Sequence, residues 1–144
     1  MMNRVLSRAA FALAIAVSLT ACDSPIDTNV GQIEGVVLRS NGSEVARFSL
    51  VDQVVTGGLQ VEVGQTSTFQ VWGLSREEVA FPLSGYLIRD PTVVIGLLAN
   101  ASVEGGDRLM IQGLEEGTTT IRFVVERGGT EQGFEVRNIP LEVF

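Results

Sequence analysis

Carboxylates are the side chains of this sequence whose types and spacing come closest to supporting catalysis. They form three pairs, which are Glu77 with Glu78, Glu115 with Glu116, and Glu104 with Asp107 across two glycines. A glycosidase-type pair needs two carboxyl groups that converge across a cleft, whereas adjacent residues of a strand point to opposite faces. We therefore expect these pairs to be solvated turn charges and not catalytic residues.

The composition removes most other catalytic chemistry. The 144 residues contain no histidine and one cysteine, and the ten basic residues are all arginine. These counts exclude zinc sites of the His or Cys type, Ser-His and Cys-His nucleophile pairs, and an internal disulfide. The formal net charge of -7 also argues against nucleic acid as a partner. We expect no enzymatic activity and no cofactor.

Calcium is the metal that the remaining side chains suit best, because hard cations prefer carboxylate and carbonyl oxygens. The sequence nevertheless has no Asp-x-Asp-x-Asp loop, and Asp90 precedes a proline in a pattern typical of a turn. We assign no metal ligand. A calcium- or carboxylate-dependent envelope protein that binds or hydrolyses a ligand stays open as the alternative function.

The N-terminus has the three-part layout of a secretory signal. Arg4 and Arg8 supply positive charge, residues 9–19 are almost wholly apolar, and residues 19–22 read Leu-Thr-Ala-Cys. The apolar stretch is about half of the roughly 20 residues that span a bilayer as a helix. A polar Asp-Ser-Pro segment follows it directly, so the pattern disfavours a permanent transmembrane helix.

The sequence Leu19-Thr20-Ala21-Cys22 resembles the lipobox of bacterial lipoproteins. The resemblance implies that residues 1–21 are a signal peptide cleaved before Cys22, and that Cys22 is the lipid attachment site, acylated with fatty acids such as palmitate. Each buried CH₂ contributes about 0.8 kcal/mol, so several acyl chains would anchor the protein to a membrane permanently. The alternatives are an ordinary secretory signal that ends near Cys22, or a structural cysteine. The expected location is the bacterial envelope, at the periplasmic face or the cell surface.

The mature chain divides into a tether and one domain. Residues 22–31 are polar and rich in turn formers, which indicates a short flexible tether. From residue 32 to residue 144, short β-type runs alternate with Gly, Pro, Asn and Asp, and no long helical periodicity is present. This pattern predicts an all-β sandwich of seven to nine strands.

Ten short runs are candidates for these seven to nine strands. Asn41-Gly42 between the first two is the strongest short-range hairpin signal, because both residues must adopt positive φ. The predicted strands cover residues 33–39, 44–51, 58–63, 66–72, 79–83, 86–89, 92–98, 109–112, 118–126 and 133–143. Alternation places Ile121, Phe123 and Val125 on a buried face. Phe69 and Val71 alternate with polar neighbours in the same way.

Residues 59–125 contain three characteristic turns, which are Val-Gly-Gln-Thr at residues 63–66, Asp-Pro-Thr-x-Val at residues 90–94, and Gly-Leu-x-x-Gly-Thr at residues 113–118. Through these turns, the segment resembles the bacterial immunoglobulin-like domains of group 2. The resemblance implies an immunoglobulin-like β-sandwich in which Leu114 fills the core beneath its turn. This chain departs from the family in having Tyr86 and Leu87 where a tryptophan is usual.

Three aromatic side chains, Trp72, Phe81 and Tyr86, lie around the long segment at residues 73–85. They could form a contact surface for carbohydrate or protein, or they could fill the core. Together these features predict a lipid-anchored envelope protein whose single domain is a non-enzymatic binding or structural module. Its expected partners are a membrane, through the lipid, and a protein or glycan of the envelope.

Overall fold

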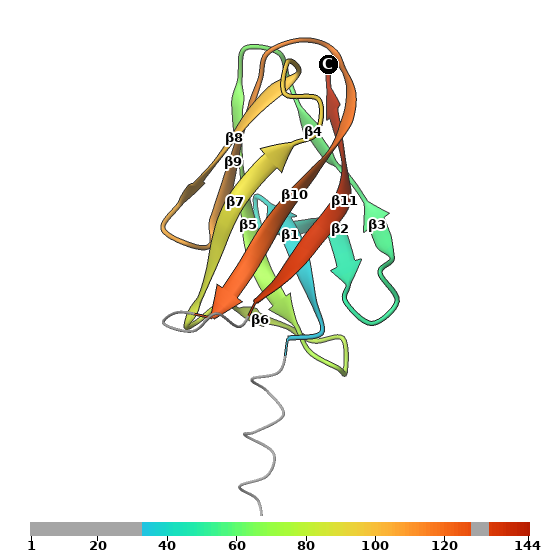
Figure 1. The fold of residues 1–144 in the computed structure, drawn as a ribbon, viewed down its shortest axis with the longest axis vertical. Coiled ribbons are helices and arrows are strands. Elements are labelled where there is room, and N and C mark those ends of the chain that lie inside the picture. Colours follow the sequence, from blue (N-terminus) through green and yellow to red (C-terminus); the bar gives the residue numbers. More distant parts are fainter. Residues whose placement is uncertain (1–32, 128–132) are drawn as a thin grey trace, which may run out of the picture. The chain divides into compact units, whose positions relative to one another are not determined.

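Figure 1 shows the fold in a computed structural model, which describes residues 33–127 and 133–144. The predicted signal peptide, Cys22 and the tether all lie outside the described residues. The described part of the chain is all-β, as predicted, and its two sheets contain eleven strands, more than the seven to nine that were expected. Within it there is no helix, and hence none with the length and hydropathy to cross a membrane.

The larger sheet, sheet A, has seven strands. Its order is β3-β2-β1-β5-β9-β8, and β6 pairs with β5 outside this path. The strands are β1 (Gly35–Ser40), β2 (Ser43–Ser49), β3 (Val55–Gly57), β5 (Thr66–Leu74), β6 (Ala80–Pro82), β8 (Ala99–Glu104) and β9 (Arg108–Gly113). All pairs in sheet A are antiparallel. Since β1 pairs with β5, the first hairpin is an integral part of the sheet.

The smaller sheet, sheet B, has four strands in the order β4-β11-β10-β7. They are β4 (Leu59–Val61), β7 (Tyr86–Val93), β10 (Gly117–Arg127) and β11 (Gly133–Val143). The short β4 runs parallel to β11, and the other two pairs are antiparallel. The chain therefore crosses from sheet A to sheet B and back several times, as in a sandwich.

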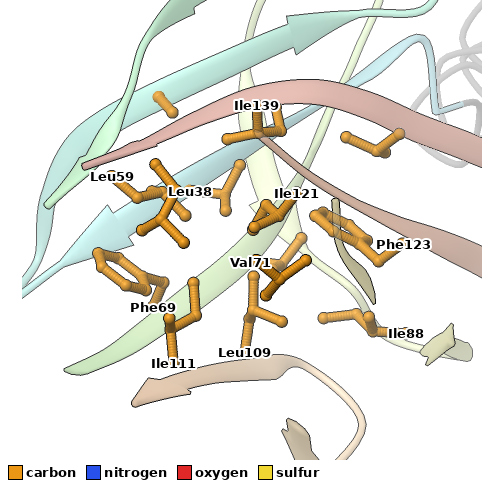
Figure 2. Packing of buried hydrophobic residues seen from close by; sticks show 14 of the residues in the cluster. Leu38, Leu59, Phe69, Val71, Ile88, Leu109, Ile111, Ile121, Phe123 and Ile139 are labelled. Carbon is orange, nitrogen blue, oxygen red and sulfur yellow. The ribbon is translucent and has the colours of Figure 1, made fainter. Parts of the chain in front are cut away.

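The core lies between the two sheets. Figure 2 shows Leu38, Val71 and Leu109 of sheet A directed toward Ile121, Phe123 and Ile139 of sheet B. The predicted alternation is confirmed, because Ile121, Phe123 and Val125 are buried, as are Phe69 and Val71. Apolar side chains at every second position of strands such as β9 and β10 contribute to this core.

The predicted hairpin at Asn41-Gly42 is confirmed. Asn41 has a φ of 51° and Gly42 a φ of 82°, so both central residues of the turn are left-handed. Two consecutive positive φ values define the turn whose twist matches that of the flanking strands. The turn joins β1 to β2 and brings Ser40 opposite Ser43.

The prediction of separate strands at residues 86–89 and 92–98 was wrong. β7 continues through the Asp90-Pro91 sequence by means of a bulge, at which Asp90 has a φ of 51° and the pairing with β10 shifts register. Proline is tolerated there because β7 is an edge strand, so its missing N–H removes no ladder hydrogen bond. The strand then ends at Val93, and a turn follows in which the Leu98 N–H bonds to the Ile95 carbonyl at 3.0 Å.

Two strands were not predicted. β3 has only three residues, and β8 has the sequence Ala-Asn-Ala-Ser-Val-Glu, whose small and polar side chains give a weak alternation signal. Its pairing with β9 places it at the edge of sheet A. A strand with so few apolar residues has no clear sequence pattern, and it is recognised only from its pairing with a neighbouring strand.

Candidate functional site

The structure separates the three carboxylate pairs. β5 runs from Thr66, beside Gln112 of β9, to Leu74, beside Gly35 of β1. The turn with Glu77 and Glu78 follows Leu74, whereas the turn with Glu115 and Glu116 follows β9, so the two turns lie at opposite ends of sheet A (Figure 1). All four of these side chains are exposed.

The third pair lies in the β8–β9 hairpin. Oε1 of Glu104 lies 3.6 Å from Nη2 of Arg108, and the two side chains form an exposed ion pair. Across the described ranges 33–127 and 133–144, no group of three or more Asp, Glu, Cys or His side chains could hold a metal ion. Asp90 belongs to the β7 bulge, where its carbonyl accepts a hydrogen bond from the Thr92 hydroxyl at 3.1 Å.

The three aromatic residues do not form one surface. Trp72 lies on the outer face of sheet A, opposite the fully buried Val37, and its ring is covered by the Arg39 guanidinium, 4.3 Å from the ring centroid. Phe81 packs over Gly73. Gly73 follows Trp72 along β5, so it faces the opposite side of sheet A from Trp72. Tyr86 packs against the core cluster.

This arrangement leaves Trp72 poorly placed to stack on a sugar. One face of its ring is occupied by Arg39, and its register partner on β1 is the buried Val37. The indole Nε1 is buried and has no hydrogen-bond partner. The contact with Arg39 is a cation–π interaction of the kind that contributes about 0.5–1 kcal/mol at partly exposed sites.

A groove of about 310 Å³ lies at the end of the sandwich where the chain enters at residue 33. Its charged lining includes Arg47 and Arg76 together with Glu34, Asp52 and Glu78. Charges of both signs thus face the same space, and Arg47 is already paired with Glu44 at 2.8 Å. The groove therefore does not favour a ligand of one charge.

The opposite end of the sandwich presents a cluster of exposed apolar side chains, which we call the apolar tip. The apolar tip contains six of the ten large hydrophobic residues that are exposed in the described part of the chain. These six are Val63, Val94, Ile95, Leu97, Leu114 and Phe144. Leu97 is the most exposed, at 77%. Sequence reasoning missed this surface.

Backbone hydrogen bonds hold the segments of the apolar tip together. The N–H of Val63 bonds to the Phe144 carbonyl at 2.8 Å, and the N–H of Gly64 bonds to the Gly113 carbonyl at 2.9 Å. The N–H of Leu114 bonds to the Leu98 carbonyl at 2.8 Å. The loops that these hydrogen bonds join lie at the upper end of the sandwich in Figure 1, near the C-terminus.

The segment at residues 94–98 is fixed to sheet B by two further hydrogen bonds. The Val94 N–H bonds to the Thr120 carbonyl at 3.0 Å, and the Ile95 N–H bonds to Oγ1 of Thr119 at 3.0 Å. Both bonds hold the backbone while the Val94 and Ile95 side chains stay exposed. The apolar side chains are thus presented on an ordered turn.

The expectation that Leu114 fills the core beneath its turn was wrong. Leu114 is 43% exposed, whereas Leu98, which lies next to the apolar tip, is buried at 8%. Leu98 packs against Gly117, where a Cβ atom would lie 3.0 Å from both methyl groups of the leucine. The turn at residues 113–117 does join two core strands, β9 and β10, as expected.

A signal for the apolar tip was present in the sequence. Val94, Ile95 and Leu97 surround Gly96, and Gly is typical of a turn. The run was interpreted as a strand because apolar residues are most often buried. Only the hydrogen bonds to Thr119 and Thr120, more than 20 positions away, identify it as an exposed turn.

Comparison with known proteins gives distant similarity at the level of structure. No family model matches the chain, and no curated protein matches it. The chain is similar to domains 4 and 5 of the S-layer protein SbsC, with a TM-score of 0.42 and 24% identity over 61% of this chain and 47% of that structure. Domains 5–6 of SbsC give a TM-score of 0.42 and 25% identity over 60% of this chain and 39% of that structure.

A longer SbsC structure, domains 4–9 of the surface layer protein, matches with a TM-score of 0.42 and 18% identity. That match covers 79% of this chain and 23% of the other structure. The chain thus spans less than half the length of each of these three solved structures.

Proposed function

We propose that this chain is a lipid-anchored protein of the bacterial cell envelope and that its β-sandwich is a non-enzymatic binding module. The anchor is Cys22, at the end of the lipobox-like sequence. The binding surface is the apolar tip. The observation that carries this proposal is the concentration of exposed apolar side chains on ordered turns at one end of the sandwich.

Exposed apolar side chains that cluster on a folded surface favour a partner, because covering them removes apolar area from water. The ordered turns strengthen the argument. A surface that is already held by hydrogen bonds loses little conformational entropy on binding. Leu97, with the largest exposed fraction in the apolar tip, is the side chain that a partner would cover most extensively.

The position of the apolar tip fits an anchored protein. The Glu34 N–H bonds to the Leu74 carbonyl, which places the start of the described chain at the end of β5 that is distant from Thr66 and the apolar tip. A chain tethered through its N-terminal side therefore has its apolar tip at the far end of the domain. This arrangement leaves the tip accessible to an envelope partner.

The alternative of a calcium- or carboxylate-dependent site finds no support in the side-chain arrangement. The Glu77–Glu78 and Glu115–Glu116 pairs are exposed and lie at opposite ends of sheet A, and Glu104 is paired with Arg108. General acid–base catalysis requires groups that converge on one substrate. We therefore propose the binding function and not the hydrolytic one.

Photo-crosslinking in living cells tests the binding function. A photoreactive amino acid is placed at Leu97 in the full chain, and a matched probe is placed at Val51, which is 71% exposed at the other end of the sandwich. The proposal expects a discrete adduct from position 97 and not from position 51. Adducts that are equal at the two positions, or absent from position 97, contradict it.

A further inference from the structure

The charges around the apolar tip indicate which partner it fits. Four exposed glutamates lie in its segments or directly beside them. They are Glu62 next to Val63, Glu115 and Glu116 next to Leu114, and Glu142 near the end of β11. Glu142 lies in register with Gln60 on β4 and Thr118 on β10.

No arginine balances these glutamates within the apolar tip. The described segments 62–66, 94–100, 113–119 and 141–144 contain no basic residue. Arg122, which lies opposite Thr92, is the nearest basic residue along β10. Within the described part of the chain, one of these four carboxylates has a polar contact: Glu142 accepts a hydrogen bond from the Gln60 amide at 3.5 Å. All four side chains are exposed, so the negative charge faces solvent.

From this arrangement, and resting on the proposed binding function, we propose that the apolar tip binds a protein segment whose apolar side chains are flanked by arginine or lysine. The apolar side chains of such a segment cover Leu97 and its neighbours. Its basic side chains lie against Glu115, Glu116, Glu62 and Glu142. Charges of opposite sign across an interface speed association and exclude partners of the wrong charge.

The same charges disfavour two other occupants. The surface of a membrane rich in anionic lipid repels carboxylates and attracts basic side chains, which the apolar tip lacks. A second copy of the chain, joined tip to tip, would place its own glutamates against these glutamates. Like charges at an interface are unfavourable.

Peptide binding to the full chain in detergent micelles tests this inference. The probes are two synthetic peptides with identical leucine positions, one with lysine and one with glutamate at the flanking positions. We expect the lysine peptide to bind at least about tenfold more tightly, and its affinity to fall as NaCl rises from about 0.05 to about 0.5 M. Equal affinity for the two peptides overturns the inference.

Variants of the full chain separate the contribution of apolar contact to peptide binding from the contribution of charge. Leu97→Ser should weaken binding of the lysine peptide about tenfold or more. The double substitution Glu115→Gln with Glu116→Gln should weaken it several-fold and flatten its salt dependence. The matched controls are Val51→Ser and the pair Glu77→Gln with Glu78→Gln, which lie at the other end of the sandwich and should change nothing. Equal losses in the control variants overturn the inference.

Two further measurements address the other occupants. In liposomes that contain brominated lipids, fluorescence of the Leu97→Trp variant should be quenched no more than that of the wild type, whose single tryptophan is Trp72. Stronger quenching identifies a membrane as the occupant and overturns the inference. The second measurement is the oligomeric state of the full chain. A dimer that Leu97→Ser dissociates identifies a second copy as the occupant and also overturns the inference. If the adduct at position 97 forms in cells and the two peptides bind equally, the binding function stands and the partner chemistry is wrong.

Discussion

The N–H of Leu114 donates a hydrogen bond to the carbonyl of Leu98 at 2.8 Å, yet only Leu98 places its side chain in the core. The Leu98 carbonyl also accepts a hydrogen bond from the Glu115 N–H at 3.2 Å. One residue therefore fixes the turn at residues 113–117 in two ways, through its carbonyl and through its buried side chain. Leu114 is left on the surface, beside the other members of the apolar tip.

The two leucines should respond very differently to truncation. Leu98→Ala removes a buried side chain and leaves a cavity against Gly117, so we expect it to lower the free energy of unfolding by about 2–5 kcal/mol. Leu114→Ala should change it by no more than about 0.5 kcal/mol, as is usual for a surface substitution. Urea unfolding of both variants measures this difference, and a larger loss in Leu114→Ala would contradict the structure.

Gly73 is required by the ring of Phe81. A Cβ atom at residue 73 would lie 2.7 Å from two carbon atoms of that ring, and Phe81 belongs to the three-residue strand β6. Gly73→Ala should therefore displace β6 and lower the free energy of unfolding by about 1–3 kcal/mol.

Gly96→Ala is the matched control for Gly73→Ala. No heavy atom lies within 4 Å of a Cβ atom built at Gly96, and its φ is not positive. The control should change the free energy of unfolding by no more than about 0.5 kcal/mol. Thermal unfolding of both variants checks the pair, and equal losses would show that packing against Phe81 is not the cause.

The parts of the fold that the sequence predicted are those determined by local pattern. The Asn41-Gly42 turn requires two residues that tolerate positive φ, and the alternation around Phe123 follows from the two-residue period of a strand. Both signals lie within a few residues of the feature that they predict. The structure confirms both.

The parts that could not be predicted depend on contacts between distant segments. Asp90-Pro91 was interpreted as a turn between strands, but its place opposite β10 at a sheet edge makes it a bulge within one strand. The choice between Leu98 and Leu114 as the core residue depends on how two separate connections meet. For the same reason, Val94, Ile95 and Leu97 of the apolar tip could not be distinguished from a buried strand by their sequence pattern.

Lipidation is tested by the substitution of Cys22. If Cys22 is both the acyl acceptor and the residue before which the signal peptide is cleaved, Cys22→Ser should give an uncleaved or soluble exported precursor. Detergent-phase partitioning and labelling with radioactive palmitate in a bacterial host measure the outcome. A Cys22→Ser protein of mature size that still enters the detergent phase would show that the anchor lies elsewhere.

Calcium should have no effect on stability if the binding function is correct. A ligand that binds the folded state raises the unfolding midpoint by mass action. Because the described carboxylates do not gather into a group that could hold a metal, the midpoint of the full chain should be the same with calcium as with a chelator. A rise that increases with calcium concentration would support the alternative function.

The most direct test of the central claim is whether the apolar tip is covered in the envelope. Leu97→Cys and Val51→Cys replace residues of nearly equal exposure, 77% and 71%, at opposite ends of the sandwich. In the purified full chain, a maleimide should modify the two new thiols at similar rates. In intact envelopes, the account predicts that modification of Leu97→Cys slows about fivefold or more because a partner covers it, while modification of Val51→Cys stays unchanged. Equal rates at the two positions in the envelope would contradict the assignment of the apolar tip as the binding surface.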